Sequence, residues 1–204
     1  MTQEPTPRNV PRHRRSAGAD GNERLTAMTG ALLLVGFAVE GVTVLQVRRL
    51  LVLHVLVGAL LIGPVVLKIA STGYRFVRYY TGSTPYVRKG PPSPVRRVLG
   101  PLVILTSVAV LGTGIVLGIV GPGNGQWLFL HKASFILWFG VMTIHVLNYA
   151  PRLPRLLSAR PAGRGIGAVP GGSVRWLGLA VSLAAGIGVA VAAMQMSVKW
   201  GISV

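Results

Sequence analysis

Long apolar segments alternate along the chain with short connections that are polar and mostly basic. An α-helix needs about 20 consecutive apolar residues to cross the hydrocarbon core of a bilayer, and each of the apolar segments meets that length. The segments are Leu25 to Val47, Leu50 to Ser71, Val98 to Val120, Trp127 to Ala150 and Trp176 to Met196. The pattern predicts an all-α integral membrane bundle of about five transmembrane helices.

The connections divide the chain into a tail and a bundle. Residues 1–24 are rich in Pro and Arg and poor in apolar side chains, which indicates a disordered basic tail, and residues 25–204 form the predicted bundle. Most Arg and Lys residues fall in this tail, in the loop Thr72 to Arg97 and in the loop Pro151 to Arg175. By the positive-inside rule, the N-terminus is therefore expected to be cytoplasmic and the protein to lie in the cell inner membrane.

Composition narrows the range of functions. Hydrophobic residues make up 51% of the chain and charged residues 12%, and the formal net charge is +17. Because the basic residues are set between apolar runs, they do not form one continuous face, so we expect membrane lipid as a partner and no nucleic acid. Cys is absent, which excludes thiolate-held metal centres and leaves histidine and carboxylate chemistry.

Three histidines stand at membrane depth. His54 and His131 each lie about four residues inside the outer end of their segments, roughly 6 Å below the boundary. One haem could be clamped between them. His145 follows His131 by fourteen residues, close to four full turns, so the two rings should point in similar directions about 21 Å apart along the axis. That spacing would place one haem in each leaflet.

The segment Leu130-His131-Lys132-Ala133-Ser134-Phe135, its continuation to His145-Val146-Leu147, and the helix of His54 resemble the bacterial b-type di-haem cytochromes of the b561 superfamily. The resemblance covers the second to fourth segments best. It implies haem b, axial histidine ligands, and electron transfer between a quinone or external donor and a partner protein. It also implies a ligand for an inner haem about fourteen residues after His54, where this chain has Lys68.

An ammonium group cannot ligate iron until it loses its proton, so Lys68 leaves three arrangements open. The first is a single haem held by His54 and His131. The second adds another haem held by His145 and Lys68, and in the third Lys68 pairs with a haem propionate. Metal-ligating residues are accordingly predicted to be His54 and His131, with His145 as the candidate for a second site.

Other polar and small residues fit simpler roles. Glu40 is expected to form a structural ion pair with Arg49 or Lys132 rather than to relay protons. The glycines near the histidines are best explained by helix packing. Two further functions stay open: a haem-free membrane scaffold or assembly subunit, and a small proton-coupled carrier that uses Glu40, Lys68 and His145. No enzyme active-site motif is evident, so any oxidoreductase activity would depend on haem and a partner.

Overall fold

The computed structural model describes residues 12–91, 93–152, 171–197 and 200, which are helices and their connections without a strand. The elements are α1 (Arg12–Leu45), α2 (Leu51–Tyr80), α3 (Thr84–Val87), α4 (Pro94–Val120), α5 (Gly125–Tyr149), the 3₁₀ turn η1 (Ala150–Arg152) and α7 (Gly172–Ser197). Among the described residues, five helices are long and apolar enough to cross a membrane. The all-α fold of a multi-pass membrane protein is thereby confirmed.

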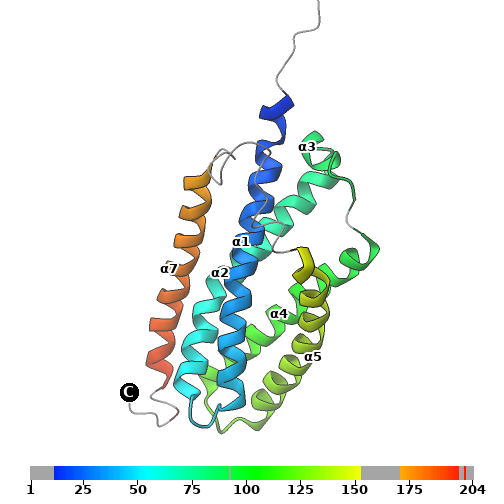
Figure 1. Cartoon of the computed structure of the whole chain (residues 1–204). Coiled ribbons are helices and arrows are strands. Elements are labelled where there is room, and N and C mark those ends of the chain that lie inside the picture. The colour runs from blue at the N-terminus through cyan, green and yellow to red at the C-terminus, as the bar shows by residue number, and fades with distance from the viewer. Residues whose placement is uncertain (1–11, 92, 153–170, 198–199, 201–204) are drawn as a thin grey trace, which may run out of the picture.

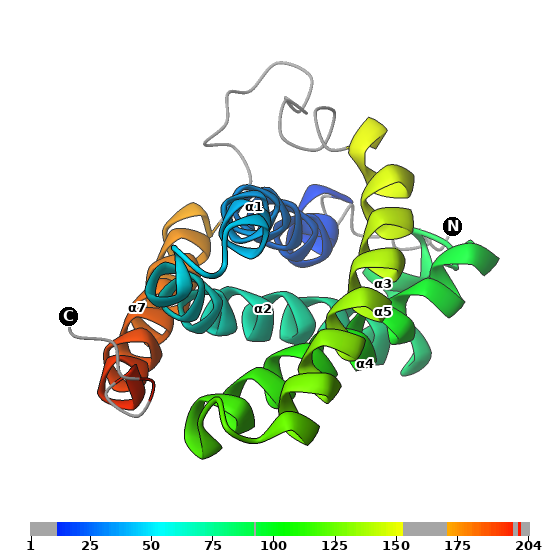
Figure 2. The ribbon, with the colours of Figure 1, turned by 90° about the horizontal axis from the view of Figure 1, so that it is seen from below.

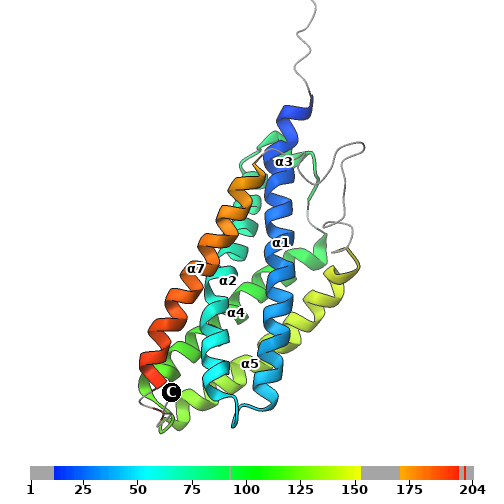
Figure 3. The same ribbon diagram turned by 60° about the vertical axis from the view of Figure 1, so that its left-hand side comes forward.

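The five long helices run up and down, so that connections gather at two ends (Figures 1 and 3). One end, called the turn end below, carries the connections at residues 46–50 and 121–124, together with the last turn of α7. The other end, called the α3 end, carries α3, the start of α7 and the end of α5. Large apolar side chains on the outer faces are exposed, for example Val35, Ile136 and Leu177 at 65%, 69% and 63%. In a bilayer such faces contact lipid.

The helices form two groups, as the view along the bundle shows (Figure 2). Helices α1 and α7 each pack against α2, and α4 and α5 form a separate hairpin. The Asn124 side chain caps the start of α5 by accepting a hydrogen bond from the Trp127 backbone N–H, with an N···O distance of 3.2 Å. A small apolar core of Leu33, Leu61 and Val65 reaches across to Leu111 of α4 and links the two groups.

The contact between α2 and α7 brings the two backbones together. A Cβ atom added at Gly63 would lie 1.9 Å from the Ser182 carbonyl oxygen, and one added at Gly186 would lie 2.1 Å from the Leu60 carbonyl oxygen. Pro64 has no N–H and therefore leaves the Leu60 carbonyl without its usual helical donor. The close approach of Gly186 shields this carbonyl from lipid, and a Cα–H group is a weak donor to such an oxygen.

Three helix boundaries differ from those expected. Helix α1 begins at Arg12, so residues 12–24 are helical rather than part of a disordered tail, and residues 1–11 lie outside the described residues. The reason is contact with the rest of the fold: Asp20 pairs with Lys89, and the Asn22 amide donates to the Ser71 carbonyl oxygen. Helix α2 continues to Tyr80, and α4 begins at Pro94 because proline suits the first turn of a helix.

Candidate functional site

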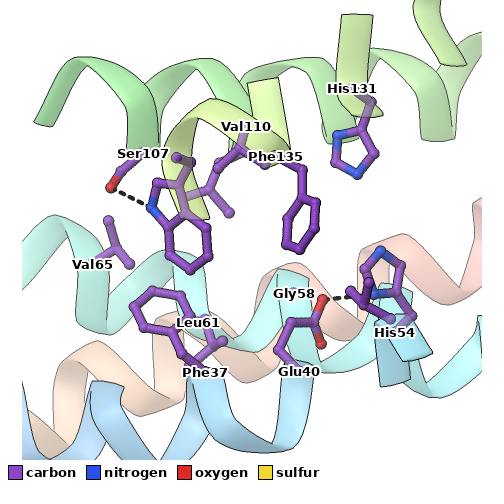
Figure 4. Close-up of a pocket in the computed structure, with 13 residues that line it drawn as sticks. Phe37, Glu40, His54, Gly58, Leu61, Val65, Ser107, Val110, His131 and Phe135 are labelled. Carbon is purple, nitrogen blue, oxygen red and sulfur yellow. Dashed lines mark hydrogen bonds and ion pairs between the residues drawn. The ribbon is translucent and has the colours of Figure 1, made fainter. Parts of the chain in front are cut away.

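A cavity of about 60 Å³ lies near the turn end, between the two helix groups. Its walls come from α1, α2, α4 and α5 and are almost entirely apolar (Figure 4). The residues that line it are Phe37, Glu40, Val44, His54, Gly58, Leu61, Val65, Ser107, Val110, Leu111, His131, Phe135 and Trp138. The sequence-predicted pair His54 and His131 therefore does meet at one site, with Glu40 beside it.

His54 is held by two residues of α1. Its Nδ1 atom lies 2.8 Å from Glu40 Oε1 and 3.2 Å from the Thr43 hydroxyl oxygen, which itself lies 3.1 Å from Glu40 Oε2. Because a carboxylate can only accept, Nδ1 carries a hydrogen, and in a neutral ring Nε2 then keeps its lone pair. Gly58 makes room for this arrangement, since a Cβ there would lie 3.2 Å from Glu40 Oε1.

The His131 ring is held by a hydroxyl group instead of a carboxylate. Its Nδ1 atom lies 3.2 Å from the Thr113 hydroxyl oxygen, which donates to the Ala109 carbonyl oxygen at 2.7 Å. Since the single Thr113 hydrogen is used in that bond, the oxygen accepts from His131 Nδ1 and again leaves Nε2 with its lone pair. Gly114 provides the space for the ring, because a Cβ there would lie 3.0 Å from His131 Cε1.

The two imidazole rings face each other across the cavity (Figure 4), with 6.3 Å between their centres and an angle of 64° between their planes. A metal bound to imidazole nitrogen lies about 2.0 Å from that nitrogen, which is itself about 1.2 Å from the ring centre, so one ion between two such rings separates their centres by about 6 Å. The observed distance of 6.3 Å between the ring centres is close to that span.

Aromatic side chains close the inner side of the cavity. Trp138 is buried, and its indole N–H donates to the Ser107 hydroxyl oxygen at 3.0 Å, which ties α5 to α4. The ring of Phe37 from α1 lies edge-on to Trp138, with 4.8 Å between ring centres. Packing between helices is thus the role that the structure gives to Trp138, which stands halfway between His131 and His145.

Lys68 and His145 both lie in the half of the bundle nearer the α3 end. The Lys68 ammonium donates to the Thr26 carbonyl oxygen of α1, and a Cβ at Gly30 would lie 2.8 Å from Nζ. Lys68 and His145 are close enough to interact electrostatically. His145 Nδ1 is buried and has no hydrogen-bond partner among the described residues, although its ring lies 4.7 Å from that of Tyr149.

One expectation about Glu40 is wrong. The structure pairs this carboxylate with His54 and not with Arg49 or Lys132, both of which are exposed. Sequence reasoning also missed Thr43 and Thr113, because a threonine in an apolar helix ordinarily bonds back to its own helix and gives no separate signal. The one signal in the sequence was that Glu40 lies shortly before the connection at residues 46–50 and His54 shortly after it.

Within the part of the chain that the structure describes, no three His, Cys, Asp or Glu residues are placed to hold a bare metal ion. A haem needs only two axial ligands from the protein, since the porphyrin supplies the other four. Comparisons with family models, curated proteins and solved structures found no match for this chain.

Proposed function

We propose that this protein is a membrane b-type cytochrome that carries electrons through haem held between His54 and His131. The observation that supports it best is the paired geometry of the two rings: their centres are 6.3 Å apart, and each Nδ1 is occupied by a partner. Histidine ligands in metal sites characteristically donate Nδ1–H to an acceptor so that Nε2 can bind. Both histidines also line one cavity, which helices α1, α2, α4 and α5 enclose.

The two histidines suit a haem as ligands, but the cavity between them is small for one. At about 60 Å³ the cavity is smaller than a porphyrin, so apolar side chains that line it must rotate away to admit the ring while the spacing of His54 and His131 is kept. Side chains, not touching backbones, fill this part of the bundle, which makes such a movement feasible. Arg48, Arg49 and Lys132 are exposed at the same end and have the charge to bind propionates. Haem iron would supply reversible one-electron transfer there.

The proposal includes an orientation and partners. The α3 end carries basic residues in the last turns of α2 and just after α3, including Arg75, Arg78 and Arg88, and we assign it to the cytoplasmic side of the inner membrane. The haem then lies near the outer face, where a quinone or an external donor can deliver electrons. The described helices form no second cofactor domain, so a partner protein receives the electrons from the haem.

The test is a dithionite-reduced minus oxidised visible spectrum of the detergent-purified protein, with haem quantified per chain by the pyridine haemochrome method. Sharp b-type bands at one haem per chain are expected. Two haems per chain would assign the second to His145, with Lys68 as ligand or as propionate partner. A protein that is colourless and cannot be reconstituted with haem would overturn the proposal.

The alternative is a haem-free membrane scaffold or assembly subunit. The small volume of the cavity is the observation that favours it. In that case the Glu40–His54 and Thr113–His131 contacts serve only to join α1 to α2 and α4 to α5. The same spectrum separates the two functions, because a scaffold gives no bands and its thermal stability does not change when haem is added.

A further inference from the structure

The two proposed ligands differ in what holds them, and this difference has a chemical consequence. His54 donates to a carboxylate, whereas His131 contacts a neutral hydroxyl group. We infer that Glu40 is a positioning residue that fixes the tautomer of His54 and makes this imidazole a stronger ligand to the iron. The inference rests on the haem site proposed above, but part of it can be tested without haem.

The geometry around Glu40 supports a fixed position for its carboxylate. The Thr43 hydroxyl, whose residue is 1% exposed, donates to the Glu40 backbone carbonyl oxygen at 2.7 Å and fills the space beside Glu40 Oε2 and His54 Nδ1. From α2, Gly58 leaves just enough room for Oε1. Helix α1 therefore contributes no ligand of its own to the site and instead orients the ligand on α2.

The direction of the electronic effect follows from charge. An anionic acceptor on Nδ1–H makes the imidazole more electron-rich, which raises ligand basicity and favours ferric over ferrous haem. The nearby negative charge acts in the same direction. We expect Glu40 to lower the midpoint potential of the bound haem, and Thr113 to have a much smaller effect through His131.

The first experiment compares Glu40→Gln with the matched variant Thr113→Val by redox titration. In E40Q the ferric preference should fall about tenfold, a rise of about 59 mV in midpoint potential for one electron, whereas T113V should shift much less. An unchanged potential in an E40Q protein that retains its haem would overturn the inference and leave the cytochrome intact. A wild-type protein without haem would instead overturn the proposed function.

A second measurement covers the case in which E40Q fails to bind haem. His54→Gly is reconstituted with haem and either imidazole or 1-methylimidazole, which cannot donate to Glu40. In H54G, the imidazole complex should have a lower midpoint potential than the 1-methylimidazole complex. The difference between the two complexes should be larger in H54G than in His131→Gly. Equal differences would contradict the role of Glu40.

The tautomer can be read without haem. In the haem-free protein with ring-¹⁵N-labelled histidine, nuclear magnetic resonance should show His54 with its proton on Nδ1, as the 2.8 Å contact to Glu40 requires. Glu40→Leu should remove this preference while His131 keeps its own signals. If wild-type His54 carries its proton on Nε2 instead, Glu40 does not position it.

Discussion

Helix α2 borders two seams: its contact with α7, and the space between it and the α4–α5 hairpin. Glycines have opposite effects at the two seams. In the α2–α7 seam, Gly63 and Gly186 let backbone touch backbone. On either side of the second seam, Gly58 of α2 makes room for the Glu40 side chain of α1, and Gly114 of α4 makes room for the His131 side chain of α5. The first seam is fixed by contact, whereas the second holds a cavity with two facing imidazoles. Small residues in a membrane helix can therefore indicate either close packing or a site, and only their neighbours decide which.

The largest expected effect comes from removing either ring that faces the cavity. His54→Ala or His131→Ala should abolish haem at this site, because the remaining imidazole leaves one face of the iron without a protein ligand. Membrane insertion should be unaffected, since neither residue is needed for partitioning. Haem per chain is measured by pyridine haemochrome.

His145→Ala is the matched control, because His145 lies on the same helix but at the other end of the bundle. This variant should keep the haem between His54 and His131. Full haem content in both H54A and H131A would show that the ligand assignment is wrong. A fall from two haems to one in H145A would show that its unpartnered Nδ1 marks a second site.

The next largest effect is on stability. Gly63→Ala or Gly186→Ala places a methyl group about 2 Å from a backbone carbonyl oxygen of the neighbouring helix, so α2 and α7 must separate. Overpacking of this kind costs about 3 kcal/mol of unfolding free energy, measured by denaturant titration in detergent.

Gly188→Ala on α7 is the control, since an added Cβ there meets nothing within 4 Å. Alanine has the higher helix propensity, so G188A should be neutral or more stable by up to about 1 kcal/mol. Equal destabilisation by G186A and G188A would mean that the close approach of α2 and α7 is absent.

The fold was more accessible from sequence than the site. Hydrophobic length alone predicted the long helices, and helical periodicity brought His54 and His131 to one depth. What periodicity cannot supply is the rotation of one helix about its axis relative to another. The Glu40 contact depends on that rotation, because it joins α1 to α2. The start of α1 depended in turn on Lys89, a residue far along the chain.

A smaller effect should follow from filling the space beside His131. Gly114→Ala places a Cβ 3.0 Å from His131 Cε1, so the ring must tilt by a few tenths of an ångström. Loss of ligand orientation of this kind costs at least about tenfold in affinity. We expect weaker haem binding in G114A with little change in thermal stability, measured by haem titration of the haem-free protein.

Gly112→Ala provides the comparison on the same helix, because an added Cβ at Gly112 has no neighbour within 4 Å. G112A should bind haem as the wild type does. If G112A and G114A weakened binding equally, the glycines of α4 would act through backbone flexibility and not through the space that they leave for His131.

The smallest effect lies away from both seams, where α1 meets the connection after α3. Lys89 forms ion pairs with Asp20 and Glu23. Burial alone would lower its pKa, but the hydrogen bonds to Asp20 and Glu23 outweigh that and raise the pKa above 10.5. The pairs are partly exposed to solvent, so Lys89→Met should cost only about 0.5 to 1 kcal/mol, whereas Arg88→Met at the neighbouring exposed position should cost less.

The raised pKa sets the pH range of this contribution. A group with a higher pKa in the folded state stabilises the fold fully below its unfolded pKa of 10.5 and loses that effect as pH rises through the folded value. Thermal midpoints of wild type and K89M should therefore differ by a constant amount at pH 7 to 9 and converge above pH 10.5. Because the α1–α3 contact lies at the end of the bundle away from His54 and His131, haem affinity should be equal in the two proteins. A change in haem affinity in K89M would mean that the two ends of α1 are coupled, and that Glu40 depends on how the start of that helix is held.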